Sequence, residues 1–378
     1  MNKQNYENEF AQLNKIIECK NTSSLKEALL LANYSKEKYP YLNNMAQFYN
    51  ILGLINFQLS DLEESILNFE KSVHINPNFY PGYYNLGLTF FNTSELDKSY
   101  NFLIKSIHIK KDYKLARDKI IELLSFYEPN FSTDNEIFKL DQKIKNIPLN
   151  IDFSKKISDR EIIYYFIKCK KIVYKTLKNL SYNKFQIFRK KSIFLNCERH
   201  KKIFFKYNSI PKYCFECFKV VIESKNIYDL LKVSLLFDQI TFFSNFNRKN
   251  MIDKKSKNDV YKSIIYCTSL EQVLEVEKKT KKILSKYFEK DFLVKSKRGC
   301  YEYEVKYPEY TKISENKTEL MNFPEKWFSN EKKFDDENTK DGLEKKIEVH
   351  NTIKGNSLHN FLIINNWVED QKLSLDIK

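Results

Sequence analysis

Two pairs of residues with metal-ligand chemistry lie close together in the middle of the chain. Cys197 and His200 are separated by two residues, and so are Cys214 and Cys217, with thirteen residues between the pairs. Thiolate sulfur and imidazole nitrogen are the ligands of closed, tetrahedral zinc sites. The spacing predicts that these four residues bind one structural zinc ion, which would leave no open position for catalysis.

Two other interpretations of the cysteines remain open. Free cysteines are often buried as small hydrophobic residues, so the group could simply pack in a core. A redox or catalytic thiol is the third interpretation, but thioredoxin-type motifs open a helix, whereas Cys217 precedes a strand-like run, 218–223. The odd number of cysteines, seven, favours a reducing compartment over a disulfide framework.

From residue 218 onward, strand patterns alternate with helix patterns. We expect strands at 218–223, 241–246, 261–267 and 292–296, with helices from 227 to 240 and from Ser269, whose side chain would cap the helix together with Gln272. The order strand-helix-strand-strand-helix-strand is typical of a ferredoxin-like α+β sandwich with sheet order 4-1-3-2. The connection 248–258 is basic and polar and is expected to be a loop.

The expected sheet order places three cysteines at one end of the sheet. Cys217 precedes the first strand, Cys267 ends the third, and Cys300 follows the fourth. Cys267 and Cys300 are therefore additional candidate metal ligands. Arg298, a cation next to Gly299 at a strand end, is a candidate for binding an anionic ligand, although a surface arginine in a basic domain is the alternative.

The net charge of +15 is concentrated in the middle of the chain. Residues 1–130 carry 14 Lys and Arg against 15 Asp and Glu, residues 131–300 carry 38 against 18, and residues 301–378 carry 12 against 16. A basic domain can bind nucleic acid or another polyanion, but a solvated lysine-rich surface produces the same composition.

The first third of the chain contains an internal repeat. The segments 49–53 and 83–87 align without a gap at tyrosine, leucine and glycine, with Gly53 and Gly87 thirty-four residues apart. Further on, Ser65 aligns with Ser99 and Ser72 with Ser106. A fixed period of this length indicates stacked helical hairpins.

The spacing over about residues 7–129 resembles the tetratricopeptide repeat. Its aromatic, Leu-Gly and small residues and Pro77 fall at the positions of that family, and 7–19 would be the first helix of a degenerate early unit. The resemblance implies antiparallel helix pairs whose concave groove holds a peptide or a protein partner.

These features predict a multidomain protein. Tetratricopeptide-like all-α repeats would occupy 1–130, a helical connector 131–190, an α+β domain with the Cys/His cluster 191–310, and a mostly irregular acidic tail 311–378. Within the tail, 361–364 and Trp367 are apolar enough for a short docking element.

The leading function is a cytoplasmic protein-interaction scaffold with a basic, zinc-stapled domain. A nucleic-acid-associated protein is the alternative, and an enzyme acting at the cysteine-rich end of the sheet is the third. No catalytic residue is assigned, and three of the six glycines belong to the repeats, so a Walker loop or dinucleotide fingerprint is not expected. No apolar run reaches the length of a membrane span, and no secretory segment is expected.

Overall fold

The computed structural model describes residues 22–130, 134–176, 182–190, 197–253, 260–289, 291–313, 320–338, 351–353 and 355–370. The chain divides into two units, Met1–Lys139 and Leu140–Lys378. The division falls within helix α8 (Glu136–Lys145). It places the sheet, the expected tail and most of the expected connector in one unit.

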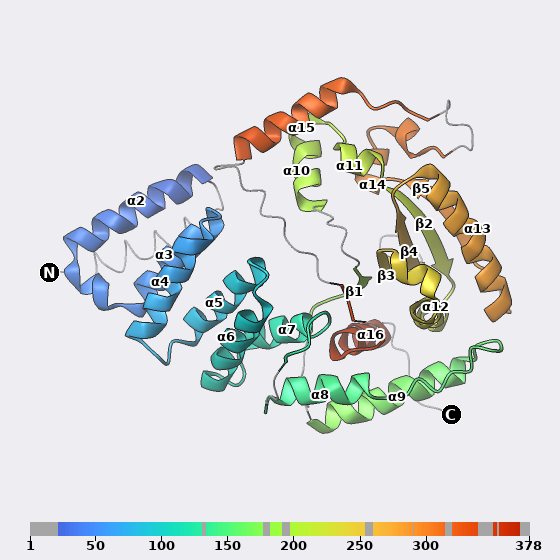
Figure 1. The fold of residues 1–378 in the computed structure, drawn as a ribbon, viewed down its shortest axis with the longest axis horizontal. Coiled ribbons are helices and arrows are strands. Elements are labelled where there is room, and N and C mark those ends of the chain that lie inside the picture. The colour runs from blue at the N-terminus through green and yellow to red at the C-terminus, as the bar shows by residue number, and fades with distance from the viewer. Residues whose placement is uncertain are drawn as a thin grey trace. The chain divides into compact units, whose positions relative to one another are not determined.

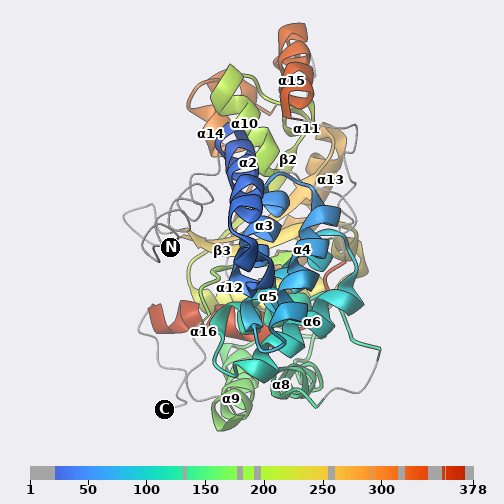
Figure 2. The same cartoon turned by 90° about the vertical axis from the view of Figure 1, so that its left-hand side faces the viewer.

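The first unit is a row of antiparallel helices (Figures 1 and 2). Its elements are α2 (Thr22–Lys38), the short 3-10 helix η1 (Pro40–Asn44), α3 (Ala46–Gln58), α4 (Leu62–Ile75), α5 (Tyr80–Asn92), α6 (Leu96–Ile109) and α7 (Lys114–Leu123). Helices α3 and α4 form one hairpin, and α5 and α6 form the next. The predicted helix 7–19 lies outside the described residues.

The repeated glycines lie where the two helices of each hairpin cross. A Cβ atom at Gly53 would lie 2.5 Å from the ring of Phe69, and one at Gly87 would lie 2.7 Å from Cγ of Leu103. The repeated serines lie on the facing helix and form hydrogen bonds across the crossing. The Ser65 hydroxyl donates to the carbonyl of Gly53, and the hydroxyl of Ser99 donates to that of Gly87.

The turn inside each hairpin also repeats. Ser60 and Ser94 both adopt left-handed backbone, with φ of 65° and 63°. In both turns the next residue closes the helix, because Asp61 N donates to the carbonyl of Asn56 and Glu95 N donates to that of Phe90. The repeat in the sequence therefore corresponds to a structural unit of two helices, the crossing between them and the turn that joins them.

The second unit is built on a five-stranded antiparallel sheet with the order β1-β3-β4-β2-β5. The strands are β1 (Gln186–Arg189), β2 (Phe218–Ser224), β3 (Arg248–Asp253), β4 (Val260–Cys267) and β5 (Leu293–Arg298). Three of the four expected strands correspond to β2, β4 and β5, and β3 takes the place of the second expected strand in the order 4-1-3-2. Strand β1, within the expected connector, extends the sheet beyond β3.

Two helices cover one face of this sheet. Helix α12 (Ile227–Gln239) contacts β4 and β2, and α13 (Leu270–Tyr287) contacts β5, β2 and β4. The buried side chains of β4 alternate, as expected for a strand with one covered face. The predicted cap of α13 is confirmed, since Ser269 Oγ accepts from Gln272 N at 3.2 Å.

The second expected strand, 241–246, is wrong. These residues form the 3-10 helix η2 (Thr241–Asn245), in which the buried Phe243 ring stacks on Phe237 at 3.9 Å. The strand lies instead in the segment expected to be a polar loop. Its polar side chains can be buried because they are paired: Arg248 bonds Asp238, and Asn250 bonds Ser234 and Ser263.

The remaining elements of this unit are helical. They are α9 (Asp159–Thr176), α10 (Cys197–Tyr207), α11 (Lys212–Phe215), α14 (Tyr301–Glu304), the 3-10 helix η3 (Pro308–Thr311), α15 (Glu325–Asn338) and α16 (Leu358–Asp370). Helices α15 and α16 lie within the segment expected to be mostly irregular. Helix α16 contains the expected docking element, with Trp367 buried and its indole donating to the carbonyl of Phe185.

Candidate functional site

The predicted metal ligands are carried by α10, α11 and the residues that precede β2. His200 lies in the first turns of α10, and Cys214 lies in α11; both are buried. His200 Nδ1 and Cys214 Sγ are 3.1 Å apart. This distance is within the ~4 Å expected between two ligands of one zinc ion.

The pair is electrically neutral as it stands. Burial, followed by the positive charge of Arg199, lowers the pKa of His200 to about 4. Burial raises the pKa of Cys214, so its thiol stays protonated at neutral pH. The Tyr303 hydroxyl donates to the same sulfur at 3.3 Å. The arrangement is therefore a packed thiol–imidazole pair rather than a charged, reactive thiolate.

Cys197, Cys217 and Cys300 form a second group of thiols around a buried lysine. Burial raises the pKa of Cys217 to about 11. The charge of Lys219 opposes this rise, and the nearby Cys300 and Cys197 add to it. The Lys219 ammonium donates to Cys300 Sγ at 3.0 Å. Burial lowers the pKa of Lys219, but the neighbouring Cys300 and Cys217 outweigh this effect, and the net direction is upward.

Strand register places Cys267 on the face of the sheet that α12 and α13 cover, but it remains near Cys217. Burial, followed by the charge of Cys217, raises the pKa of Cys267. The Cys217 carbonyl accepts a hydrogen bond from Gly299 N, directly after β5, at 2.7 Å. Cys267 pairs with Phe218 and is buried with the residues of β4 that face the helices. The three cysteines thus reach the same end of the sheet, as expected, but Cys267 lies in the core.

Within the described ranges, no three His, Cys, Asp or Glu side chains are arranged as ligands of a metal ion. The structure brings His200 and Cys214 together and places Cys197 near Cys217. It does not bring the four residues to one point, and the zinc site stays a prediction.

Sequence reasoning missed Lys219 and Tyr303. Lys219 could have been noticed as the single charge in the apolar run 218–222. Tyr303 could not, because the segment around it lacks a clear helical period and its contact with Cys214 spans 89 residues.

Arg298 is buried, with 4% of its surface exposed. Its Nε donates to the carbonyl of Phe215 at 2.7 Å, and its guanidinium lies 3.9 Å from the centre of the Phe215 ring. The alternative of a surface arginine is therefore wrong. Arg298 also lines a cavity at the start of α13.

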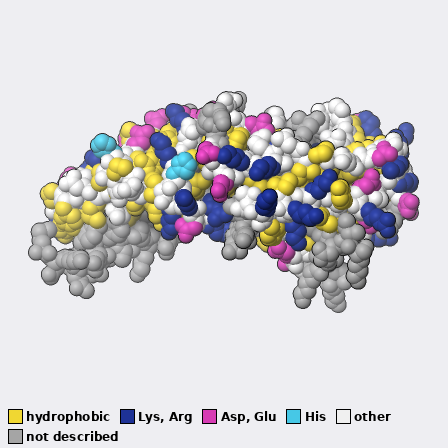
Figure 3. Space-filling view, turned by 90° about the horizontal axis from the view of Figure 1, so that it is seen from below, with side chains coloured by type: hydrophobic (Ala, Val, Ile, Leu, Met, Phe, Trp, Pro, Cys, Tyr) yellow, Lys and Arg dark blue, Asp and Glu magenta, His cyan; other side chains and the backbone are white. Residues whose placement is uncertain are grey.

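Some basic side chains of the middle segment form ion pairs with the acidic end of the chain. Those of α10 form ion pairs with α14 and α15: Arg199 with Glu331 and Asp335, Lys201 with Glu302, and Lys206 with Glu337. On the face shown in Figure 3, Lys and Arg are interspersed with acidic and apolar side chains. These pairs neutralise only three of the 38 Lys and Arg of residues 131–300, so the net positive charge of this segment persists.

The first helices of the repeats form a continuous surface. Helix α3 contacts α5, and Asn85 Nδ2 donates to Asn50 Oδ1 at 2.7 Å. Tyr84 on α5 is close enough to Asp118 and Glu122 on α7 for their charges, after burial, to raise its pKa. The first helices of successive hairpins therefore lie side by side along one face of the array.

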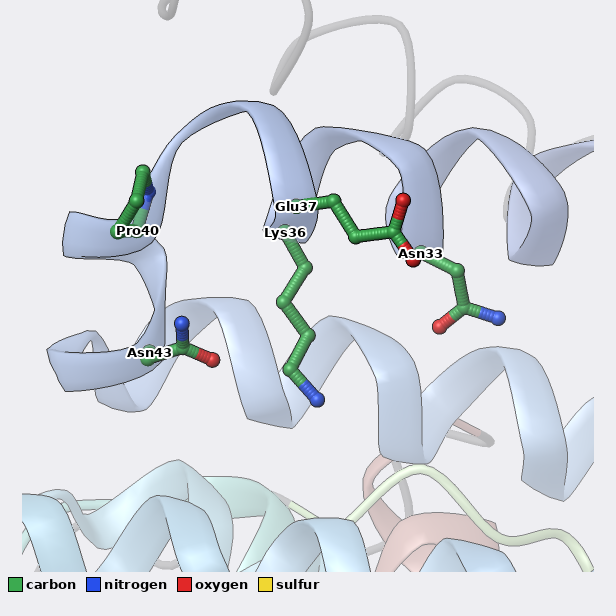
Figure 4. Close-up of a pocket in the computed structure, with 5 residues that line it drawn as sticks. All are labelled: Asn33, Lys36, Glu37, Pro40 and Asn43. Atoms are coloured by element: carbon green, nitrogen blue, oxygen red, sulfur yellow. The ribbon is translucent and has the colours of Figure 1, made fainter.

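A polar cavity of about 520 Å³ lies beside α2 and η1, at the N-terminal end of the row of helices (Figure 4). Its lining side chains are Asn33, Lys36, Glu37, Pro40 and Asn43, from α2 and η1. All five are exposed or half-buried. A cavity without a buried polar group has little to orient a ligand, so we assign it no role.

Comparison with known proteins identifies the class of the first unit. Residues 46–79, which contain α3 and α4, match the tetratricopeptide repeat family. The chain therefore contains a tetratricopeptide-repeat region, and such repeats suggest a protein-interaction scaffold. In the described part of the chain, no helix is long and apolar enough to cross a membrane.

Among solved structures, the chain is similar to a mutant O-GlcNAc transferase of Thermobaculum terrenum. The sequence identity is 14%, the TM-score is 0.31, and the match covers 41% of this chain and 31% of the transferase. The chain thus spans less than a third of that enzyme. No curated protein sequence matches the chain.

Proposed function

We propose that this protein is an interaction scaffold whose repeats bind a peptide segment of a partner along the first helices. The observation that supports the proposal is the adjacency of α3, α5 and α7, which exposes equivalent side chains of successive repeats on one surface. A cytoplasmic location fits the free thiols of the second unit.

The chemistry of this surface indicates the kind of peptide. Tyr84 and Phe91 are half-buried on α5, and the Phe91 ring is flanked by Phe126 and by the Lys119 ammonium. On the next helix, Asp118 and Glu122 already form ion pairs with Lys114 and Lys119. A peptide with apolar side chains complements the two aromatic rings.

The test is a selection of twelve-residue peptides on the immobilised full-length chain, followed by affinity measurements. Tyr84→Ala should weaken the selected peptides at least about tenfold, as expected for an aromatic anchor. Leu67→Ala is the matched control, because Leu67 is 57% exposed on the second helix α4. Equal losses in both variants would refute binding along the first helices.

For the second unit we propose a ferredoxin-like sandwich stapled by one zinc ion on Cys197, His200, Cys214 and Cys217. Two observations support it: the four-strand order with both helices on one face, and the 3.1 Å contact between His200 and Cys214. The ion would hold α10, α11 and the start of β2 together. The cysteine protons would be released on binding, as thiolates are the ligands.

Elemental analysis of the purified chain tests this assignment. We expect about one zinc per chain, lost in Cys214→Ser and retained in Cys267→Ser, since Cys267 lies in the core. Well under one zinc in the unaltered protein would favour simple packing of the cysteines.

A further inference from the structure

The sheet of the second unit has one face covered by α12 and α13 and a second face turned away from them. Along β2, β3 and β4, buried side chains alternate with half-buried ones, and in the half-buried set only Lys219 is buried. On the two edge strands, Phe188 of β1 and Lys295 of β5 are exposed. We call the face formed by these half-buried and exposed side chains the open face.

Strand register places five side chains of the open face in one row, the central row. The row crosses all five strands through directly paired residues: Phe188, Lys249, Ile264, Val221 and Lys295. Paired residues project to the same face of a sheet. Because neighbouring strands lie about 4.8 Å apart, the row is roughly 19 Å long. It has an aromatic ring at one end, lysines near both ends and aliphatic side chains between them.

A second row lies beside the central row, at the end of the sheet near Cys217. It consists of Tyr266, Lys219 and Lys297, which are again directly paired. The Lys219 ammonium lies 5.4 Å from the centre of the Tyr266 ring. Lys297 makes a contact of 3.7 Å with Glu304, and both side chains remain partly exposed. This row therefore repeats the combination of an aromatic ring with lysines.

Positive charge is concentrated in these two rows, which contain four lysines and no acidic residue. In the described part of the chain, Lys249 and Lys295 have no ion-pair partner. Burial, followed by the charge of Lys219, lowers the pKa of Lys249. The acidic side chains of the open face, Glu223 and Asp253, lie on the other side of the central row, and Asp253 is already paired with a lysine of β4. The two rows therefore attract a polyanion.

Phe188 supplies an aromatic surface next to this charge. Its side chain is 39% exposed, and the ammoniums of Lys249 and Lys190 lie 5.6 and 5.9 Å from the ring centre. These distances are near the outer limit of a cation–π contact, about 6 Å, so the ring remains accessible. Nucleic-acid bases stack on exposed aromatic side chains while lysines contact the phosphates.

We propose that the open face binds single-stranded nucleic acid along its two basic rows. A base stacks on Phe188, and backbone phosphates pair with Lys249 and Lys295. An acidic protein has no base for the ring, and a duplex keeps its bases stacked on one another. This binding is separate from peptide binding by the repeats and requires no zinc ion.

Titration of the full-length chain with a labelled twelve-nucleotide RNA strand, followed by fluorescence anisotropy, tests the proposal. A DNA strand of the same sequence, titrated in parallel, identifies the preferred sugar. Four phosphate contacts predict that affinity falls about 50-fold between about 50 and 200 mM salt. Lys249→Gln should weaken binding and reduce the slope of log affinity against log salt by about 0.7. Lys282→Gln is the matched control, because it removes an exposed charge from α13, on the opposite side of the sheet, and should change neither quantity.

The stacking contact is tested by a second pair of variants. Phe188→Ala should weaken binding at least about fivefold, whereas Tyr164→Ala, which removes a 51% exposed ring from α9, should not. A duplex of the same sequence and a twelve-residue polyglutamate should each bind at least about tenfold more weakly than the strand. Thermal transitions verify that the variants fold. Equal losses within either pair of variants, equal affinity for polyglutamate or the duplex, or no binding at submillimolar strand would each overturn the proposal.

Discussion

Gly87 and Leu103 approach so closely that no side chain fits between them. A Cβ atom at Gly87 would lie 2.7 Å from Leu103 Cγ and 3.3 Å from the Leu103 backbone nitrogen. Leu103 is fully buried, and the Ser99 hydroxyl bonds the Gly87 carbonyl at 2.8 Å beside it. Helices α5 and α6 are therefore held at a separation that only glycine permits.

Replacing Gly87 by valine should destabilise the first unit. The added side chain overpacks the crossing, which typically costs about 1–3 kcal/mol of unfolding free energy. Chemical denaturation monitored by circular dichroism measures this loss. In a Leu103→Ala background the space is vacated, so the same substitution should cost clearly less; equal costs in both backgrounds would contradict the contact.

A glycine substitution in a hairpin turn is expected to stabilise the first unit. Ser94 has a φ of 63°, a conformation that costs a side-chain-bearing residue about 1 kcal/mol and costs glycine almost nothing. Ser94→Gly should raise the unfolding free energy by up to about this amount. Ser94→Ala keeps the strain and should leave stability nearly unchanged, and a gain in both variants would point to another cause.

Part of this architecture was predictable from the sequence because its determinants are local. The crossing of two adjacent helices needs glycine and serine at fixed offsets, and Gly53, Gly87, Ser65 and Ser99 show those offsets directly. The strands β2, β4 and β5 were likewise recognisable from their apolar runs.

Other elements depend on partners that are distant in the sequence. Strand β3 is polar, so its sequence predicts a loop. Arg248 can be buried in this strand because it forms an ion pair with Asp238 on α12. The position of Cys267 on the helix-covered face of the sheet follows from strand register, which the linear order does not reveal. The burial of Arg298 similarly depends on Phe215 and Tyr310.

The buried cluster of Asp238 with Arg189 and Arg248 predicts an acid-sensitive fold. Burial raises the pKa of Asp238, but the two guanidiniums outweigh this, and the net direction is below the ordinary 3.8. Because the folded pKa is the lower one, the stabilisation is complete above about pH 3.8 and is lost as the pH falls through the folded value.

Asp238→Asn should therefore lower the unfolding free energy at pH 7 by about 3–5 kcal/mol, since it leaves two buried arginines without a carboxylate. It should also flatten the decline of stability below about pH 3.8. Denaturant titrations across pH measure both effects. Asp253→Asn, which alters a half-buried pair with Lys262, is the control and should cost much less.

The most direct test of the scaffold is the salt dependence of what the chain binds. Selected peptides and a 20-nucleotide single strand are titrated against the full-length protein at about 50 and 200 mM salt, with Tyr84→Ala and Leu67→Ala in parallel. We predict peptide affinity that changes little with salt and depends on Tyr84 but not on Leu67. Tight nucleic-acid binding that falls about 10³-fold over this range, with no peptide whose affinity depends on Tyr84, would contradict the account.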